Sequence, residues 1–169
     1  MSAGHRSGFS HFHTIRSDCQ KLLANPRIRA YLAKPYKVDT SHHIPLTGGS
    51  NKAGNIYYLD PRIAEQDRPF VLWHERVEKA ARDVFDMSYD RAHMYATCAE
   101  HMRLEAAGGN WDEYKKRIGA VVREDEKSKS DNLPSDLDPG PYRESGMTHL
   151  LRDRPLIGRI LGKKNPARG

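Results

Sequence analysis

The most informative part of the chain is the stretch Phe70-Val-Leu-Trp-His-Glu-Arg-Val-Glu-Lys-Ala-Ala-Arg-Asp-Val-Phe-Asp86. Its apolar residues recur three and four positions apart, which is the spacing of one face of an α-helix. We therefore predict a helix over residues 70–86. The residues that define its apolar face are Val77, Ala80, Ala81, Val84 and Phe85.

Two further helices are predicted after this one. Ser88 belongs to a residue type that caps helices, and it precedes a helical pattern over 89–107 that Gly108-Gly109 ends. The short connection lets this second helix return antiparallel to the first. Asn110 begins a sequence similar to a capping box, so a third helix is predicted over 110–126.

The sequence before residue 70 contains both helical and extended patterns. Helical spacing predicts short helices over 14–24 and 28–33. The segments 36–45 and 56–60 are rich in β-branched and aromatic residues and flank turn-forming residues over 47–55, so they predict a β-hairpin with a long turn. The predicted fold class is therefore α+β, mostly helical with one β-hairpin.

Length and composition divide the chain into one domain and two arms. Its 169 residues suffice for a single domain of ordinary size. We predict a flexible N-terminal arm over 1–13, a folded domain over 14–126 and an extended basic C-terminal tail over 127–169. The tail is predicted from its Ser, Asp, Pro and Gly content.

The net charge of +6 comes from the two ends of the chain. Residues 1–36 and residues 149–169 each hold six basic residues and one acidic residue, whereas residues 37–148 hold more acidic than basic residues. Basic arms around an acidic body predict electrostatic contact between the arms and an acidic partner. Nucleic acid is a weakly supported candidate for that partner.

The sequence favours a cytoplasmic protein with no membrane partner. No run of eighteen apolar residues is present to span a bilayer, and the N-terminus lacks the apolar segment of a secretory signal. Two cysteines, Cys19 and Cys98, are too few for a disulfide framework, so we expect reduced thiols that pack as small core residues.

A metal site is predicted on the helix over 70–86. His74 and Glu78 are four residues apart, so their side chains project from one face of the helix, one turn from each other. This pair can bind one Zn²⁺ ion, as the two histidines of an HExxH sequence do in metalloproteases. Glu75 lies about 100° around the helix from His74, where it can reach a metal-bound water without binding the metal.

The third zinc ligand is predicted on the next helix. His93 shares a face of that helix with Glu100, beside alanines that would let the two helices approach closely. We assign His93 as the ligand and Glu100 as the partner that orients an imidazole. His101, or Glu100 itself, is an alternative third ligand.

A different interpretation of the first helix needs no metal. Glu75 with Lys79, and Glu78 with Arg82, have the spacing of ion pairs on an exposed helix face. Glu78, however, lies on the apolar stripe, and a partly buried carboxylate is costly unless it is paired or bound to a metal. Its position therefore favours the metal site.

The ligand set resembles that of the zincin metallopeptidases whose third ligand is on the helix after the active helix. In that group the first helix supplies His, Glu and His, and the second supplies Glu. Here the corresponding residues are His74, Glu75, Glu78 and His93, with two residue types exchanged. The resemblance implies a zincin-like minidomain, a Zn²⁺ cofactor and peptide-bond hydrolysis with Glu75 as the general base.

The stretches 38–45, 56–62 and 74–80, with Ala92-His93, are also similar to small phage- and prophage-encoded proteins. This resemblance covers about residues 36–115. It implies a protein of the host-cell cytoplasm or of the virion.

Two functions follow from these resemblances. The first is a zinc-dependent peptide hydrolase of phage or prophage type, whose peptide or protein substrate adds as a strand to the segment 38–42 or 56–59. The alternative is a non-enzymatic phage structural or accessory protein that binds a neighbouring subunit or nucleic acid through its arms, including residues 127–169. A metal held by four protein ligands would instead be a purely structural site.

Overall fold

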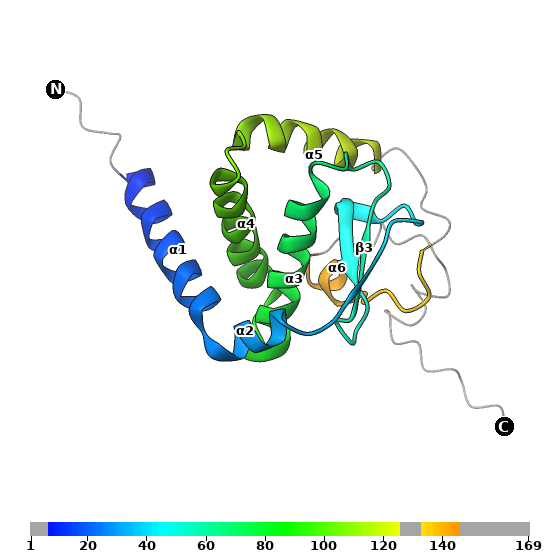
Figure 1. Cartoon of the computed structure of the whole chain (residues 1–169), viewed down its shortest axis with the longest axis horizontal. Coiled ribbons are helices and arrows are strands. Elements are labelled where there is room, and N and C mark those ends of the chain that lie inside the picture. The colour runs from blue at the N-terminus through cyan, green and yellow to red at the C-terminus, as the bar shows by residue number, and fades with distance from the viewer. Residues whose placement is uncertain (1–6, 126–132, 146–169) are drawn as a thin grey trace.

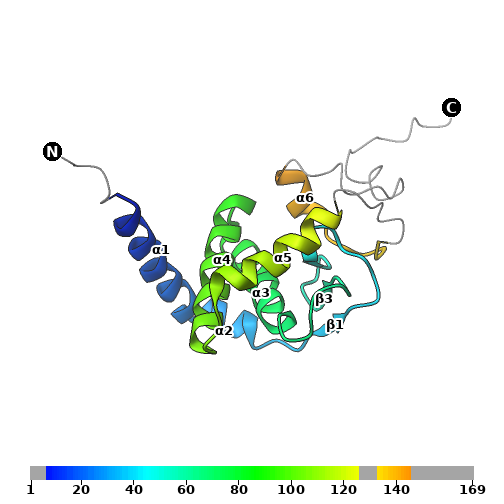
Figure 2. The same ribbon diagram turned by 90° about the horizontal axis from the view of Figure 1, so that it is seen from above.

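The computed structural model describes residues 7–125 and 133–145. In chain order its elements are α1 (Ser7–Ala24), α2 (Pro26–Leu32), β1 (Lys37–Asp39), the 3₁₀ helix η1 (Pro45–Thr47), β2 (Gly48–Ser50), β3 (Ile56–Leu59), α3 (Arg68–Phe85), α4 (Tyr89–Ala106), α5 (Trp111–Asp125) and α6 (Gly140–Glu144). Helices α3 and α4 lie in the middle, with α1 on one side and the sheet on the other (Figures 1 and 2). The predicted α+β class, mostly helical, is confirmed.

Helices α3 and α4 pack closely because the residues between them are small. Side chains this short let two helices approach each other and fill the interface without voids. The alanines are at most 1% exposed, and they belong to the main hydrophobic cluster. The small residues of this interface are Val77, Ala80 and Ala81 of α3 with Ala92, Ala96 and Ala99 of α4.

Helices α1 and α2 cover the side of the α3–α4 pair that faces away from the sheet. Cys19 of α1 and Ile28 of α2 are fully buried there. Both cysteines are free thiols in the core, as predicted. Helix α1 begins at Ser7, so residues 7–13 are helical although a flexible arm was predicted over 1–13; residues 1–6 lie outside the described part of the chain.

The starts of α4 and α5 are held in different ways. Asn110 caps α5 as predicted, because its Oδ1 accepts hydrogen bonds from the second and third backbone N–H groups after it, at 3.0 and 3.1 Å. Ser88 makes no such side-chain bond at the start of α4. There the carboxylate of Glu144, in α6, accepts from the N–H of Tyr89 at 2.8 Å. No helix within the described ranges combines the length and the apolarity needed to cross a membrane.

The sheet has the strand order β1-β3-β2. β2 is antiparallel to β3, with Gly49 opposite Tyr58, and β1 is parallel to β3, with Val38 opposite Tyr57. The hairpin is therefore formed by β2 and β3. The prediction that the segment 36–45 supplies its first strand was wrong, because only residues 37–39 of that segment are a strand, and they lie parallel to β3.

The backbone around Pro45 explains this difference. Leu46 and Thr47 have φ angles of 62° and 80°, in the left-handed region that residues with bulky side chains rarely adopt. The chain turns there and continues as β2, so Gly48, which we expected in a turn, begins a strand. Since β3 is the central strand, the segment 56–59 has no free edge for a peptide substrate.

Residues 133–145 pack on the sheet, although an extended tail was predicted over 127–169. Leu133, Leu137 and Tyr142 are at most 5% exposed and belong to one buried cluster with residues of the η1 and β3 regions. The N–H of Asp138 donates to the carbonyl of Ser50 at 2.7 Å, along the outer edge of β2. The rest of the predicted tail, 127–132 and 146–169, lies outside the described residues.

Candidate metal centre

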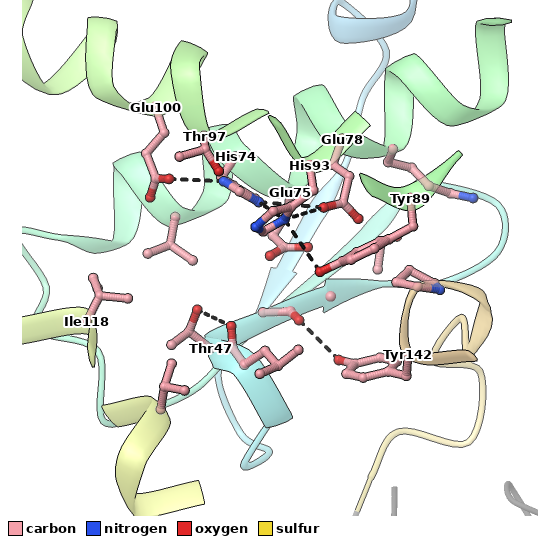
Figure 3. Close-up of a pocket in the computed structure, with 18 of the residues that line it drawn as sticks. Thr47, His74, Glu75, Glu78, Tyr89, His93, Thr97, Glu100, Ile118 and Tyr142 are labelled. Carbon is pink, nitrogen blue, oxygen red and sulfur yellow. Dashed lines mark hydrogen bonds and ion pairs between the residues drawn. The ribbon is translucent and has the colours of Figure 1, made fainter. Parts of the chain in front are cut away.

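Three side chains from α3 and α4 converge on one point (Figure 3). Nε2 of His74 lies 3.1 Å from Nδ1 of His93, which lies 3.0 Å from Oε2 of Glu78. The third side of this triangle, from His74 Nε2 to Glu78 Oε2, is 3.6 Å. Ligand atoms placed 2.0–2.1 Å from a tetrahedral zinc would lie roughly 3.3 Å apart. The three residues thus form a group that can hold a metal ion.

Local structure explains why these atoms meet. His74 and Glu78 are one turn apart on α3, and the short connection before α4 brings His93 back along the same face. The alanines between the helices allow this close approach. The structure brings the three predicted residues within reach of one ion, and their role as metal ligands stays a prediction.

His74 is oriented by a carboxylate on its other side. Its Nδ1 donates to Oε2 of Glu100 at 3.0 Å, and the hydroxyl of Tyr114 donates to the other oxygen of Glu100. This contact leaves Nε2 of His74 directed at the triangle. A carboxylate that fixes the tautomer of an imidazole in this way is a common neighbour of protein metal sites. Glu100 therefore lies beside an imidazole, as predicted.

The charges of the cluster influence one another strongly. Burial disfavours the imidazolium of His74, but its hydrogen bond to Glu100 and the nearby carboxylate of Glu78 raise its pKa well above the ordinary value. Burial also disfavours the charged form of Glu78, yet the two imidazoles lower its pKa to about 2. In the absence of a metal, Glu78 is therefore a carboxylate held between two histidines.

Glu75 lies in the same cleft beneath β2. A Cβ atom added to Gly48 would be only 2.7 Å from Oε1 of Glu75, so the side chain occupies the space that this glycine leaves. Burial, followed by the negative charge of Glu78, raises the pKa of Glu75 to about 8. Glu75 thus faces the cleft beside the triangle without belonging to it, as the sequence predicted (Figure 3).

The alternative third ligand His101 lies elsewhere on α4. Its Nε2 is 3.2 Å from Oε1 of Glu105, and its ring stacks on Trp111 with centroids 4.3 Å apart. His101 directly follows Glu100, which shares a face of α4 with His93. Since one position along a helix turns a side chain by about 100°, His101 lies off that face. Glu100 is also not part of the triangle, since it contacts the far nitrogen of His74.

The ion pairs expected for a solvated helix face are replaced by others. Nζ of Lys79 contacts Asp83 at 2.9 Å and Asp138 at 3.3 Å, and Arg82 pairs with Glu144. Glu75 and Glu78, which were expected to pair with Lys79 and Arg82, face the cleft instead. The structure therefore contradicts the interpretation of α3 as a uniformly solvated surface.

Tyr89 is a site residue that the sequence reasoning missed. Its ring stacks on His93 with centroids 5.2 Å apart, and its hydroxyl lies 3.5 Å from Nδ1 of His93 (Figure 3). The signal was present in the sequence, because Tyr89 and His93 have the i,i+4 spacing of neighbours on a helix. Tyr89 restrains one side of His93, a candidate ligand whose side chain is 46% exposed.

The cluster opens into a cleft of about 480 Å³. Its walls come from α3, α4, α5, β2 and the segment with α6, so distant parts of the chain enclose it. No family model, no curated protein and no solved structure matches the chain. The resemblances to zincins and to phage proteins therefore stay predictions.

Proposed function

We propose that the chain is a zinc-dependent peptide hydrolase, of the phage or prophage type that the sequence resemblance implies. His74, Glu78 and His93 would hold the zinc ion. The observation that carries the proposal is the triangle of their donor atoms, with sides of 3.0, 3.1 and 3.6 Å, opening into a cleft that also holds Glu75.

The donor set supports zinc as the metal. Two imidazole nitrogens and one carboxylate oxygen are a ligand combination of catalytic zinc sites, which keep a further position open. Zinc bound there would lower the pKa of a water molecule and polarise a carbonyl group. The exposure of His93 and the size of the cleft favour such an open site over a closed structural one.

The other residues of the cleft have roles that follow from their contacts. Glu75 would take a proton from the attacking water and return it to the leaving amine, as a general base and then a general acid. Glu100 would hold His74 in the tautomer that presents Nε2 to the metal. We place the enzyme in the host-cell cytoplasm, where free Cys19 and Cys98 remain reduced.

The first arm of the test measures bound metal in the purified full-length protein by elemental analysis. We expect one zinc per chain in the wild type and much less in His74→Ala. The matched control is His101→Ala, which removes an imidazole from α4 outside the triangle and should keep the zinc. Equal zinc content in the wild type and His74→Ala would overturn the ligand assignment.

The second arm measures hydrolysis of fluorescein-labelled casein by the zinc-loaded protein. Glu75→Gln should keep its zinc and lose at least about 100-fold in rate, because a positioned general base contributes that much. The control Glu105→Gln changes an acid that pairs with Arg16 and His101 and does not line the cleft, so this variant should hydrolyse casein normally. A zinc-loaded wild type without hydrolytic activity would favour the non-enzymatic alternative.

A further inference from the structure

The cleft has two chemically different halves. One half holds the carboxylates and imidazoles of the candidate metal centre. Beyond His74 the walls become mostly apolar, and Thr97 and Ile118 lie on opposite sides of this second half (Figure 3). The large apolar residues that line the cleft come from η1, α3 and α5 and are Leu46, Val71, Trp111, Tyr114, Ile118 and Val122.

Two polar groups that border the apolar half, the carboxylate of Glu100 and the hydroxyl of Thr47, already have partners. The carboxylate of Glu100 accepts from His74 and from Tyr114. The hydroxyl of Thr47 donates to the carbonyl of Leu46. An apolar group placed here therefore leaves these bonds intact and gains the free energy of its own transfer from water.

The apolar half is joined to the metal centre through the helices that they share. Val71 is three residues before His74 on α3, and Thr97 is four residues after His93 on α4. Such positions are about 5–6 Å apart between Cβ atoms. A substrate bound at the metal can therefore place its neighbouring side chain in the apolar half of the cleft.

We infer that this half of the cleft is a specificity pocket, which selects substrates with a large aliphatic or aromatic side chain next to the reacting carbonyl. The inference rests on the proposed function, because the metal centre would hold the reacting carbonyl. The pocket itself is argued from the residues that line it. Ile118 and Val122, one turn apart on α5, are the residues that set its size.

The experiment compares two hydroxamic acids that differ only in their apolar tails, acetohydroxamic acid and 4-methylpentanohydroxamic acid. A hydroxamate binds zinc through its two oxygens, and the tail then enters the neighbouring space. Calorimetric titration of the zinc-loaded full-length protein should give at least about tenfold tighter binding for the longer compound, because each buried methylene adds favourable transfer free energy.

Two variants of α5 identify the pocket. Val122→Phe fills it, so the ratio of the two affinities should fall to about one. Ala120→Phe makes the same kind of change at an exposed position of the same helix and should keep the wild-type ratio. Equal binding of the two compounds to the wild type, or an unchanged ratio in Val122→Phe, would overturn the inference.

A metal-free measurement separates this inference from the proposed function. Failure of acetohydroxamic acid to bind the zinc-treated protein would count against the metal centre alone. Toluene titrated into the metal-free protein should still shift the amide NMR signals around Ile118, since an apolar cavity binds such molecules without a metal. The absence of those shifts would overturn the pocket whatever the metal result.

Discussion

At the scale of single residues, Gly48 is the position where the sheet and the candidate site meet. Its lack of a side chain lets β2 lie directly on Glu75, since an added Cβ would be 2.7 Å from Oε1 and 2.9 Å from both Cδ and Cγ of that residue. The hydroxyl of Tyr142 also donates to the carbonyl of Gly48 at 3.1 Å, which restrains the strand from its other side.

We therefore expect Gly48→Ala to displace the carboxylate of Glu75. Zinc content should stay at the wild-type level, because the ligand triangle does not contact Gly48, while the rate of casein hydrolysis should fall by about 10- to 100-fold, as misplacement of a reacting group does. Parallel assays of zinc and of turnover measure the two effects.

Gly119→Ala is the matched control for that substitution. Gly119 is on α5 and also lines the cleft, but an added Cβ there meets only the end of the flexible Arg123 side chain at 3.3 Å and does not reach Glu75. This variant should keep its turnover and gain about 0.5–1 kcal/mol in free energy of unfolding, because alanine favours a helix over glycine. Normal turnover by Gly48→Ala would show that the position of Glu75 does not limit the reaction.

The residues of the candidate site differ in how far the sequence predicts them. His74, Glu75 and Glu78 follow from helical geometry, because the angle between positions three or four apart is fixed once the helix forms. His93 requires in addition a short connection and small residues between the helices, and both can be read from the sequence. Tyr142 cannot be predicted in this way, because its contact with Gly48 joins residues 94 positions apart.

At the scale of elements, the three long helices after residue 67 were predicted well, whereas α6 and the strand partners were not. The helical period of α3, α4 and α5 is a property of each segment alone, so their bounds agree closely with the predicted ones. Strand pairing is a property of two segments. The extended pattern of β1 does not predict that its partner β3 lies parallel to it. It also does not predict that Leu46 and Thr47, with positive φ angles, turn the chain into β2.

Helix caps supply a prediction at this scale. Asn110→Ala should lower the free energy of unfolding by about 1 kcal/mol, because the cap bonds to two backbone N–H groups of α5 are lost. Ser88→Ala should change it by much less, since the side chain of Ser88 makes no cap bond to α4. Urea unfolding of both variants measures the difference, and equal losses would contradict the conclusion that Ser88 makes no cap bond to α4.

At the scale of the whole molecule, the chain closes the cleft with a segment that follows α5 by several residues. Leu133, Leu137 and Tyr142 fill a buried cluster with Ile44 and Tyr58, and Glu144 then reaches back to α4. Average composition concealed this segment, because three apolar residues are spread among polar ones and turn formers. Their burial depends on a surface built by residues about 75–100 positions earlier, which no local pattern describes.

This packing makes residues 133–145 part of the folded domain. Leu137 is 2% exposed, so Leu137→Ala should lower the free energy of unfolding by about 2–4 kcal/mol through lost burial and a cavity. Val38→Ala also shortens an aliphatic side chain of the sheet region, but Val38 is 43% exposed, and its loss should be within about 0.5 kcal/mol. Urea unfolding followed by circular dichroism compares them. If Leu137→Ala unfolds at the same urea concentration as the wild type, the segment contributes no stability, and the wall that it gives to the cleft cannot hold Gly48 over Glu75.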